Sequence, residues 1–139
     1  MARITGAKAH SARLRNLSGP DMVRRVGAAL FAGGQTIQVE AQLSITRGAV
    51  SGANHVPSAP GQPPNNDTSV LANNIETVQT GPLKAEVSSN APYAAALEFG
   101  TSKMAERPYM RPATAAKRKE VTALVRRAVS NAIRTSKGA

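Results

Sequence analysis

The sequence predicts an α+β fold made of a long N-terminal helix, a central β-hairpin or small antiparallel sheet, a short helix and a long C-terminal helix. Three observations lead there. Apolar residues recur at helical spacing over 19–46 and again after Pro112, and two alternating segments flank Gly81-Pro82. A chain of 139 residues has room for one domain. We therefore predict a basic arm over 1–17 and a single α+β domain over 18–139.

The first long helix follows the arm. Residues 1–17 combine weak periodicity with small and basic side chains, which is typical of an arm or a frayed helix. Ser18 is suited to cap the next helix, and Pro20 is tolerated in a first turn. The apolar positions that follow are Val23, Val26, Leu30, Ile37 and Ala41. Gly33-Gly34 costs about 1 kcal/mol per glycine relative to alanine, so the pair predicts a kink or a close helix–helix crossing.

A long loop is predicted over 47–66, which is rich in Pro, Gly, Ser and Asn. Its prolines favour an extended path; they are Pro57, Pro60, Pro63 and Pro64. Two interpretations stay open. The loop reaches a neighbouring subunit, or it is a flexible insertion.

A hairpin follows the loop. Asp67 or Ser69 is placed to cap one helical turn through Leu71. Segments 75–80 and 83–89 alternate apolar and polar residues, and Gly81-Pro82 between them marks a turn. A two-stranded hairpin is marginal alone, so it must pack on a helix or join the sheet of another subunit.

Two more helices complete the prediction. The first is short, with Asn90 as its cap, Pro92 in its first turn and Gly100 as a left-handed stop. The last helix begins at Pro112, and its apolar stripe is Val121, Leu124, Val125, Ala128 and Ala132. Its opposite face gathers Lys119, Arg126, Arg134 and Lys137.

The net charge of +10 is concentrated at the two ends of the chain. Residues 1–25 hold six basic residues against one acidic residue, and 103–139 hold ten against two, whereas 26–102 hold two against five. This pattern suits docking onto acidic proteins, onto nucleic acid, or head to tail onto copies of the same chain. The alternative is a solvated basic surface that keeps a small domain soluble.

Composition argues against several function classes. The chain has no Cys, which removes thiolate nucleophiles and Cys-ligated metal sites. His10 and His55 have no second ligand at metal-binding spacing, and the carboxylates are scattered. We expect no catalytic residues, no cofactor and no metal, and hence no enzyme. We also expect no membrane helix and no secretory signal. Only four aromatic residues are available for base stacking, although non-specific phosphate contact needs only Lys and Arg.

One segment, 93–113, holds three of the four aromatic residues. Glu98 precedes the predicted helix stop, and Arg107 and Arg111 follow the turn, so both arginines are candidates to pair with Glu98. We expect an apolar cluster under this turn, made of Phe99, Tyr109 and Met110. Pro108 and Pro112 stiffen the entry to the last helix. The alternative is a purely structural turn that holds two helices together.

This segment resembles the signature of phage head–tail joining proteins, the small neck or tail-completion components of lambda-like long-tailed phages. The matching positions are Tyr93-Ala94, Glu98-Phe99-Gly100-Thr101, Ser102-Lys103-Met104 and Arg107-Pro108-Tyr109-Met110-Arg111-Pro112-Ala113. The Pro-rich loop and Asp67-Thr68 also look like the family pattern. Ser69 stands where the family usually has Gly, and Tyr109 where it usually has Phe. The resemblance covers about 18–135 in element order, and it is specific over about 57–113.

The resemblance implies a structural virion protein of the phage neck or tail, assembled in the host cytoplasm. Its partners would be copies of itself in a ring, a head-closure or connector protein, the tail tube or tail terminator, and genomic DNA contacted non-specifically in the channel; no membrane is implied. We expect subunit or partner contacts at Pro57, Pro60, Pro63, Pro64, Lys119, Arg126, Arg134 and Lys137. The alternatives are a tail terminator that caps the tail tube, or a basic nucleic-acid-binding protein.

Overall fold

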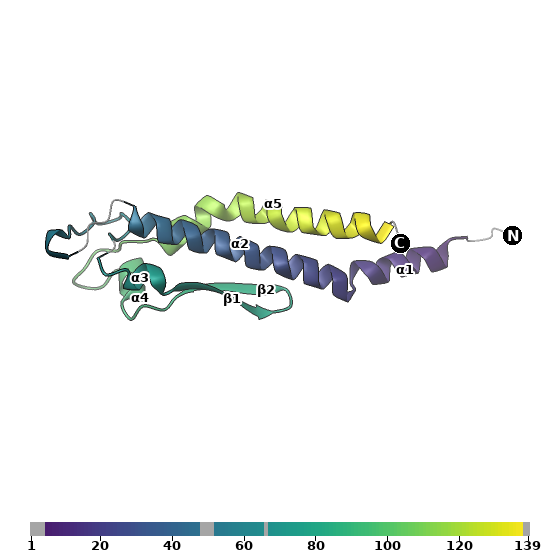
Figure 1. Cartoon of the computed structure of the whole chain (residues 1–139), viewed down its shortest axis with the longest axis horizontal. Helices are drawn as coiled ribbons and strands as arrows, with labels where there is room; N and C mark the ends of the chain where they lie inside the picture. Colours follow the sequence, from purple (N-terminus) through teal and green to yellow (C-terminus); the bar gives the residue numbers. More distant parts are fainter. Residues whose placement is uncertain (1–4, 48–51, 66, 138–139) are drawn as a thin grey trace.

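Two long helices lie side by side in an elongated body, and a β-hairpin covers the other side of the first of them (Figure 1). The computed structural model describes residues 5–47, 52–65 and 67–137, without the side chains of 136 and 137. The two long helices are α2 (Pro20–Thr46) and α5 (Met110–Lys137). The strands are β1 (Ile75–Gly81) and β2 (Lys84–Ser89). This arrangement confirms the predicted α+β class.

The first described element is a helix, α1 (Ala7–Leu17), where an arm or frayed helix was predicted. It extends away from the N-terminal end of α2 and is the outermost element at that end of the body (Figure 1). The prediction that Ser18 caps α2 is wrong. Gly19 is the N-cap, and the Ser18 hydroxyl donates back to the Leu14 carbonyl at 3.3 Å. Asp21 in the first turn of α2 pairs with Arg24 and Arg25 at 2.6 and 2.8 Å.

Glycines allow α2 to pack closely on both of its covered sides. A Cβ atom on Gly33 would lie 2.9 Å from a methyl group of Val121 in α5. One on Gly34 would lie 2.6 Å from the Thr77 methyl group in β1. The predicted close helix–helix crossing at Gly33-Gly34 is therefore confirmed at Gly33. Gly34 in addition allows the hairpin to pack closely against α2.

The hairpin matches its predicted segments, and its antiparallel register pairs Ile75 with Ser89. The register is irregular between Gln79 and Gly81, just before the tight turn. The hairpin is fixed to α2 by the Thr77 hydroxyl, which donates to Gln38 Oε1 at 2.8 Å. Within the described residues no third strand pairs with either edge of this two-stranded sheet.

The core is small and lies where the C-terminal half of α2 meets α3 (Val70–Asn73), α4 (Ala94–Phe99) and the start of α5. Its largest fully buried side chains are Tyr109, Ile45 and Ile75. The remaining buried members are mostly alanines: Ala41, Leu71, Ala72, Ala91, Ala94 and Ala113. The Pro-rich loop, which contains the short 3-10 helix η1 (Gly52–Asn54), lies at the same end.

Two helix starts differ from the prediction. The short helix α4 begins at Ala94 and not at Asn90, because the Asn90 side chain donates to Glu76 Oε1 at 2.6 Å and so ties β2 to β1. The last helix begins at Met110, two residues before Pro112, because a carboxylate from another element caps it there. The single helical turn expected through Leu71 is confirmed as α3.

Candidate functional site

The centre of the 93–113 segment is the buried carboxylate of Glu98, which is 5% exposed at the end of α4. Oε2 accepts the backbone N–H groups of Tyr109 and Met110 at 2.9 and 3.0 Å. Oε1 accepts the backbone N–H of Arg111 at 2.9 Å. These amides open α5 and have no partner within the helix, so Glu98 acts as the N-terminal cap of a helix that begins 12 residues later.

Arg111 closes this arrangement from the solvent side. Its Nε donates to Glu98 Oε1 at 3.1 Å, and its Nη2 donates to the Glu98 carbonyl at 2.7 Å and to Glu106 at 2.9 Å. Burial opposes ionisation of Glu98, but these backbone and side-chain hydrogen bonds outweigh it and lower its pKa. The predicted pairing of Glu98 with Arg111 is confirmed.

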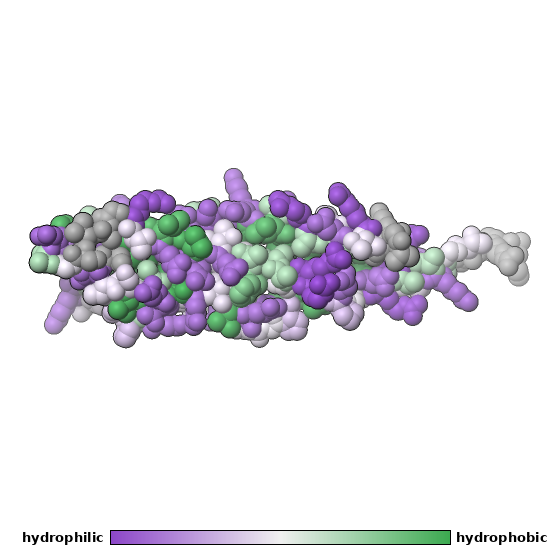
Figure 2. Space-filling model, viewed as in Figure 1, coloured by the Kyte–Doolittle hydropathy of each residue, from purple (hydrophilic) through white to green (hydrophobic). Residues whose placement is uncertain are grey.

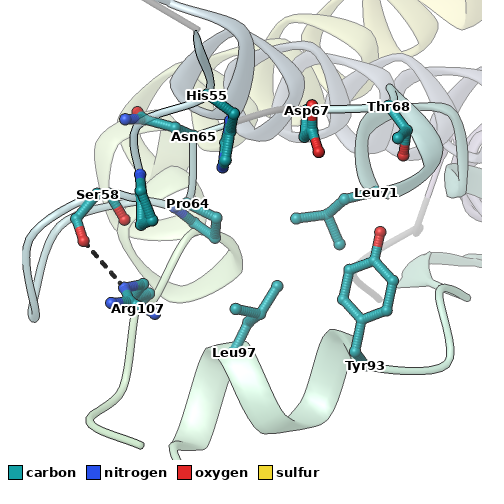
Figure 3. A pocket seen from close by; sticks show the side chains of 11 residues that line it. His55, Ser58, Pro64, Asn65, Asp67, Thr68, Leu71, Tyr93, Leu97 and Arg107 are labelled. Carbon is teal, nitrogen blue, oxygen red and sulfur yellow. Dashed lines mark hydrogen bonds between the residues drawn. The ribbon is translucent and has the colours of Figure 1, made fainter. Parts of the chain in front are cut away.

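The predicted pairing of Glu98 with Arg107 is wrong. The backbone N–H of Arg107 donates to the Leu97 carbonyl at 2.6 Å, and its Nε donates to the Ser58 carbonyl in the Pro-rich loop at 3.2 Å (Figure 3). Glu98 already accepts three backbone N–H groups and the Arg111 side chain, and Arg107 points toward the loop instead.

The predicted apolar cluster forms only in part. Tyr109 is 1% exposed and Met110 packs against the core, whereas Phe99 is 69% exposed. Consecutive residues of a helix point about 100° apart, so burying Glu98 turns Phe99 outward. The Arg111 guanidinium lies over the Phe99 ring, 5.4 Å from its centroid.

Tyr109 links the segment to the hairpin. Its hydroxyl lies 2.7 Å from the hydroxyl of Ser89 in β2. Burial raises the pKa of Tyr109, and the nearby Glu98 charge adds to that shift despite the opposing hydrogen bond to Ser89. Sequence reasoning missed Ser89, because a partner 20 residues away carries no local signal.

The turn between α4 and α5 is closed at Gly100, which has a φ of 74° and ends α4 as predicted. Its ψ of 176° is extended, so it is not the left-handed helical conformation that was expected. A Cβ there would lie 2.9 Å from the Glu106 amide nitrogen. Within the turn, the backbone N–H of Thr101 donates to the Met104 carbonyl at 2.8 Å. Of the two prolines that flank the start of α5, Pro108 is half-buried and Pro112 is exposed in the first helical turn.

The described part of the Pro-rich loop folds back on its own chain. The Gly61 N–H donates to the Glu106 carbonyl at 2.9 Å, in addition to the bond from Arg107 to Ser58. Pro57 and Pro60 are exposed, Pro63 is half-buried, and Pro64 is buried. Residues 48–51 and 66 lie outside the described residues. Contact between this loop and a neighbour stays a prediction.

A cavity of about 210 Å³ separates the loop from α4 (Figure 3). Two residues line its α4 side: Leu97 in the helix and Tyr93 just before it. They face Pro64, His55 and Leu71 across the cavity. Throughout the described ranges no three His, Cys, Asp or Glu side chains are grouped so that they could hold a metal ion.

The outer face of α5 carries the predicted cations. Lys119, Arg126 and Arg134 are exposed, and the first two line a shallow groove together with Arg118. The side chain of Lys137 lies outside the described residues. The apolar stripe of α5 turns toward α2, and Ala132 is its buried member. None of the helices in the described part of the chain is long and apolar enough to span a membrane.

Comparison with known proteins gives one match. A family model described as "Bacteriophage HK97-gp10, putative tail-component" matches residues 8–100, which is more than half of the chain. Neither the curated proteins nor the solved structures contain a match. The matched range includes the Pro-rich loop, the hairpin and Glu98, and it ends before α5.

Proposed function

Because this chain belongs to the HK97-gp10-like family of phage tail components, we propose that it is a structural protein of the virion neck. In this proposal it joins the head connector to the tail tube by assembling into a ring around the DNA channel. It acts by assembly and not by catalysis.

The observation that carries the proposal is the imbalance between buried and exposed apolar side chains. Among the described residues, the buried core contains four large apolar side chains, and its other members are alanines; the four are Ile45, Leu71, Ile75 and Tyr109. Nine large hydrophobic residues are exposed in the described structure: Leu14, Val39, Leu43, Val56, Val70, Val78, Leu83, Tyr93 and Phe99. Figure 2 shows hydrophobic side chains at the surface over the long helices, between hydrophilic ones. A subunit built this way gains stability from neighbours.

The basic face of α5 supports a place beside DNA or beside an acidic neighbouring ring. Lys119, Arg126 and Arg134 project from one side of a single rigid helix. Contact with phosphate needs cations and no base-reading aromatic residues, which suits DNA that passes through a channel whatever its sequence.

The test is the mass and shape of the purified full chain, by native mass spectrometry and electron microscopy. We expect a closed ring of one copy number that binds both isolated tail tubes and connector-bearing heads. A ring that binds only tail tubes would identify a tail terminator. A chain that stays monomeric and binds free DNA with a steep salt dependence would replace the proposal with a nucleic-acid-binding function.

A further inference from the structure

The helix α1 has little in its own chain to stabilise it. None of its 11 residues, all of them described, is buried. Its N-cap is Gly6, which offers no capping side chain, and its first turn holds no acidic residue. Helices shorter than about 12–15 residues are marginal in water, because their stability comes mainly from packing an apolar face. α1 contacts α2 and α5 of its own chain, but these contacts bury none of its residues. The apolar packing that this helix lacks is therefore left to a partner outside its own subunit.

One face of α1 is suited to such packing. Ala7, His10, Leu14 and Leu17 follow one another at intervals of three and four residues, which places them on the same side of the helix. Leu14 is 53% exposed. The stripe is flanked by cations on both sides, namely Lys8 and Arg15 on one and Arg13 on the other. Because the helix contains no carboxylate, α1 is a basic amphipathic helix with one apolar face.

A groove between α2 and α5 has the complementary character. Val39 and Leu43 lie one turn apart on α2 and are 51% and 45% exposed. Glu40 and Glu120 line the same groove and share Lys117, at 3.7 and 3.4 Å from its Nζ. Two carboxylates against one ammonium group leave the groove acidic. A second groove on α5 is lined by Arg118, Lys119 and Arg126, which would repel α1.

We propose that α1 of one copy docks in the α2–α5 groove of a second copy, with Leu14 against Val39 and Leu43. The arginines of α1 then face Glu40 and Glu120. The same subunit cannot fill its own groove, because Val39 lies about 28 Å along α2 from Pro20, and α1 leads off in the opposite direction (Figure 1). Contacts between two different surfaces repeat from subunit to subunit and close into a ring when the rotation allows it. This inference rests on the proposed function and adds the contact that builds the ring.

The absence of cysteine makes a disulfide test direct. Leu14→Cys and Leu43→Cys are introduced into separate full-length chains, and the two proteins are mixed, allowed to assemble and oxidised. We expect the mixed 14–43 dimer as the main product. The matched control replaces Leu43→Cys with Val78→Cys, an equally exposed position on the hairpin. Equal yields from the two mixtures would overturn the docking of α1 in the groove.

A charge exchange tests the same contact without cysteine. Arg13→Glu with Arg15→Glu should weaken assembly about tenfold or more. Mixing that variant with a Glu40→Lys, Glu120→Lys chain should restore mixed rings. Rings that persist without a 14–43 crosslink would overturn the α1 contact and leave the proposed function standing. A chain that stays monomeric would contradict both. Loss of connector binding from intact rings in the arginine variant would assign α1 to the connector and overturn the contact between copies.

Discussion

Arg111 donates three hydrogen bonds to Glu98: its backbone N–H and Nε reach Oε1, and its Nη2 reaches the Glu98 main-chain carbonyl. Both the last turn of α4 and the first turn of α5 are held by this pair. Because the carboxylate also accepts two further amides, the direction in which α5 leaves the core depends on one buried side chain. The long basic helix is thereby oriented from its first residue.

Removing the charge of Glu98 should destabilise the fold. We expect Glu98→Gln to lower the free energy of unfolding by about 1–3 kcal/mol, because its amide replaces a charged acceptor of several hydrogen bonds. The matched control is Glu106→Gln, which loses only an exposed ion pair to Arg111 and should cost less than about 1 kcal/mol. Urea unfolding followed by circular dichroism measures both. Equal losses would show that the Glu98 cap contributes no more than a surface pair.

The same carboxylate should make stability depend on acidity. Folding lowers the pKa of Glu98, so its contribution is complete above the ordinary glutamate pKa of about 4.3 and is lost as the pH falls toward the lower folded value. Midpoints of unfolding measured between neutral pH and this acidic range should fall more steeply for the natural chain than for Glu98→Gln. Parallel profiles would contradict the assignment.

The close packing of α2 predicts that alanine is harmful where helix propensity favours it. A Cβ on Gly27 would overlap the backbone carbonyl oxygen of Pro82, which cannot move without displacing the hairpin turn. Gly27→Ala should therefore cost about 1–3 kcal/mol, although propensity alone predicts a gain of about 1 kcal/mol. Ala28→Gly, at the exposed neighbouring position, measures the propensity effect in the same helix. A raised melting temperature for Gly27→Ala would contradict this packing.

Ser69 adopts a left-handed backbone conformation, with a φ of 63°, directly before α3. The phage family that this sequence resembles usually has glycine at this position, and glycine adopts the left-handed conformation without strain. We expect Ser69→Gly to be more stable than Ser69→Ala by about 1 kcal/mol. Both variants lack the hydroxyl group, so the difference isolates the backbone. Thermal unfolding of the two variants decides the matter, and a more stable alanine variant would contradict the expectation.

The outer face of α5 should matter for assembly and not for folding. Arg126→Glu with Arg134→Glu reverses two exposed cations, and we expect joining of heads to tails to fall about tenfold or more, equivalent to about 1.4 kcal/mol. The charge-matched control is Arg24→Glu with Lys84→Glu, on exposed positions of α2 and the hairpin. Infectious particles counted in a complementation assay provide the measurement. Unchanged yields from the α5 variant would remove this face from any assembly role.

The elements themselves could be predicted because their signals are local. Helical spacing and Pro20 located α2 to within one residue of its observed start, and alternation around Gly81-Pro82 located the hairpin. The phage-family resemblance was likewise a matter of adjacent residues, and the family match over 8–100 confirms it. Capping at Ser18 and Asn90 was predicted wrongly, because each side chain found a competing partner.

By itself, the sequence determined the class and the order of the helices and strands, and it identified Arg107 and Arg111 as the two candidate partners of Glu98. Only the tertiary structure decided that Arg107 turns to Ser58, 49 residues away, and that Phe99 faces outward while its neighbour Glu98 is buried. It also decided that Gly27 and Gly34 meet the hairpin while Gly33 meets α5. The physical reason is common to all of these. Periodicity predicts which side of a helix or strand is apolar. The partner of a charged or small residue depends instead on which distant segment tertiary packing brings within a few ångströms of it.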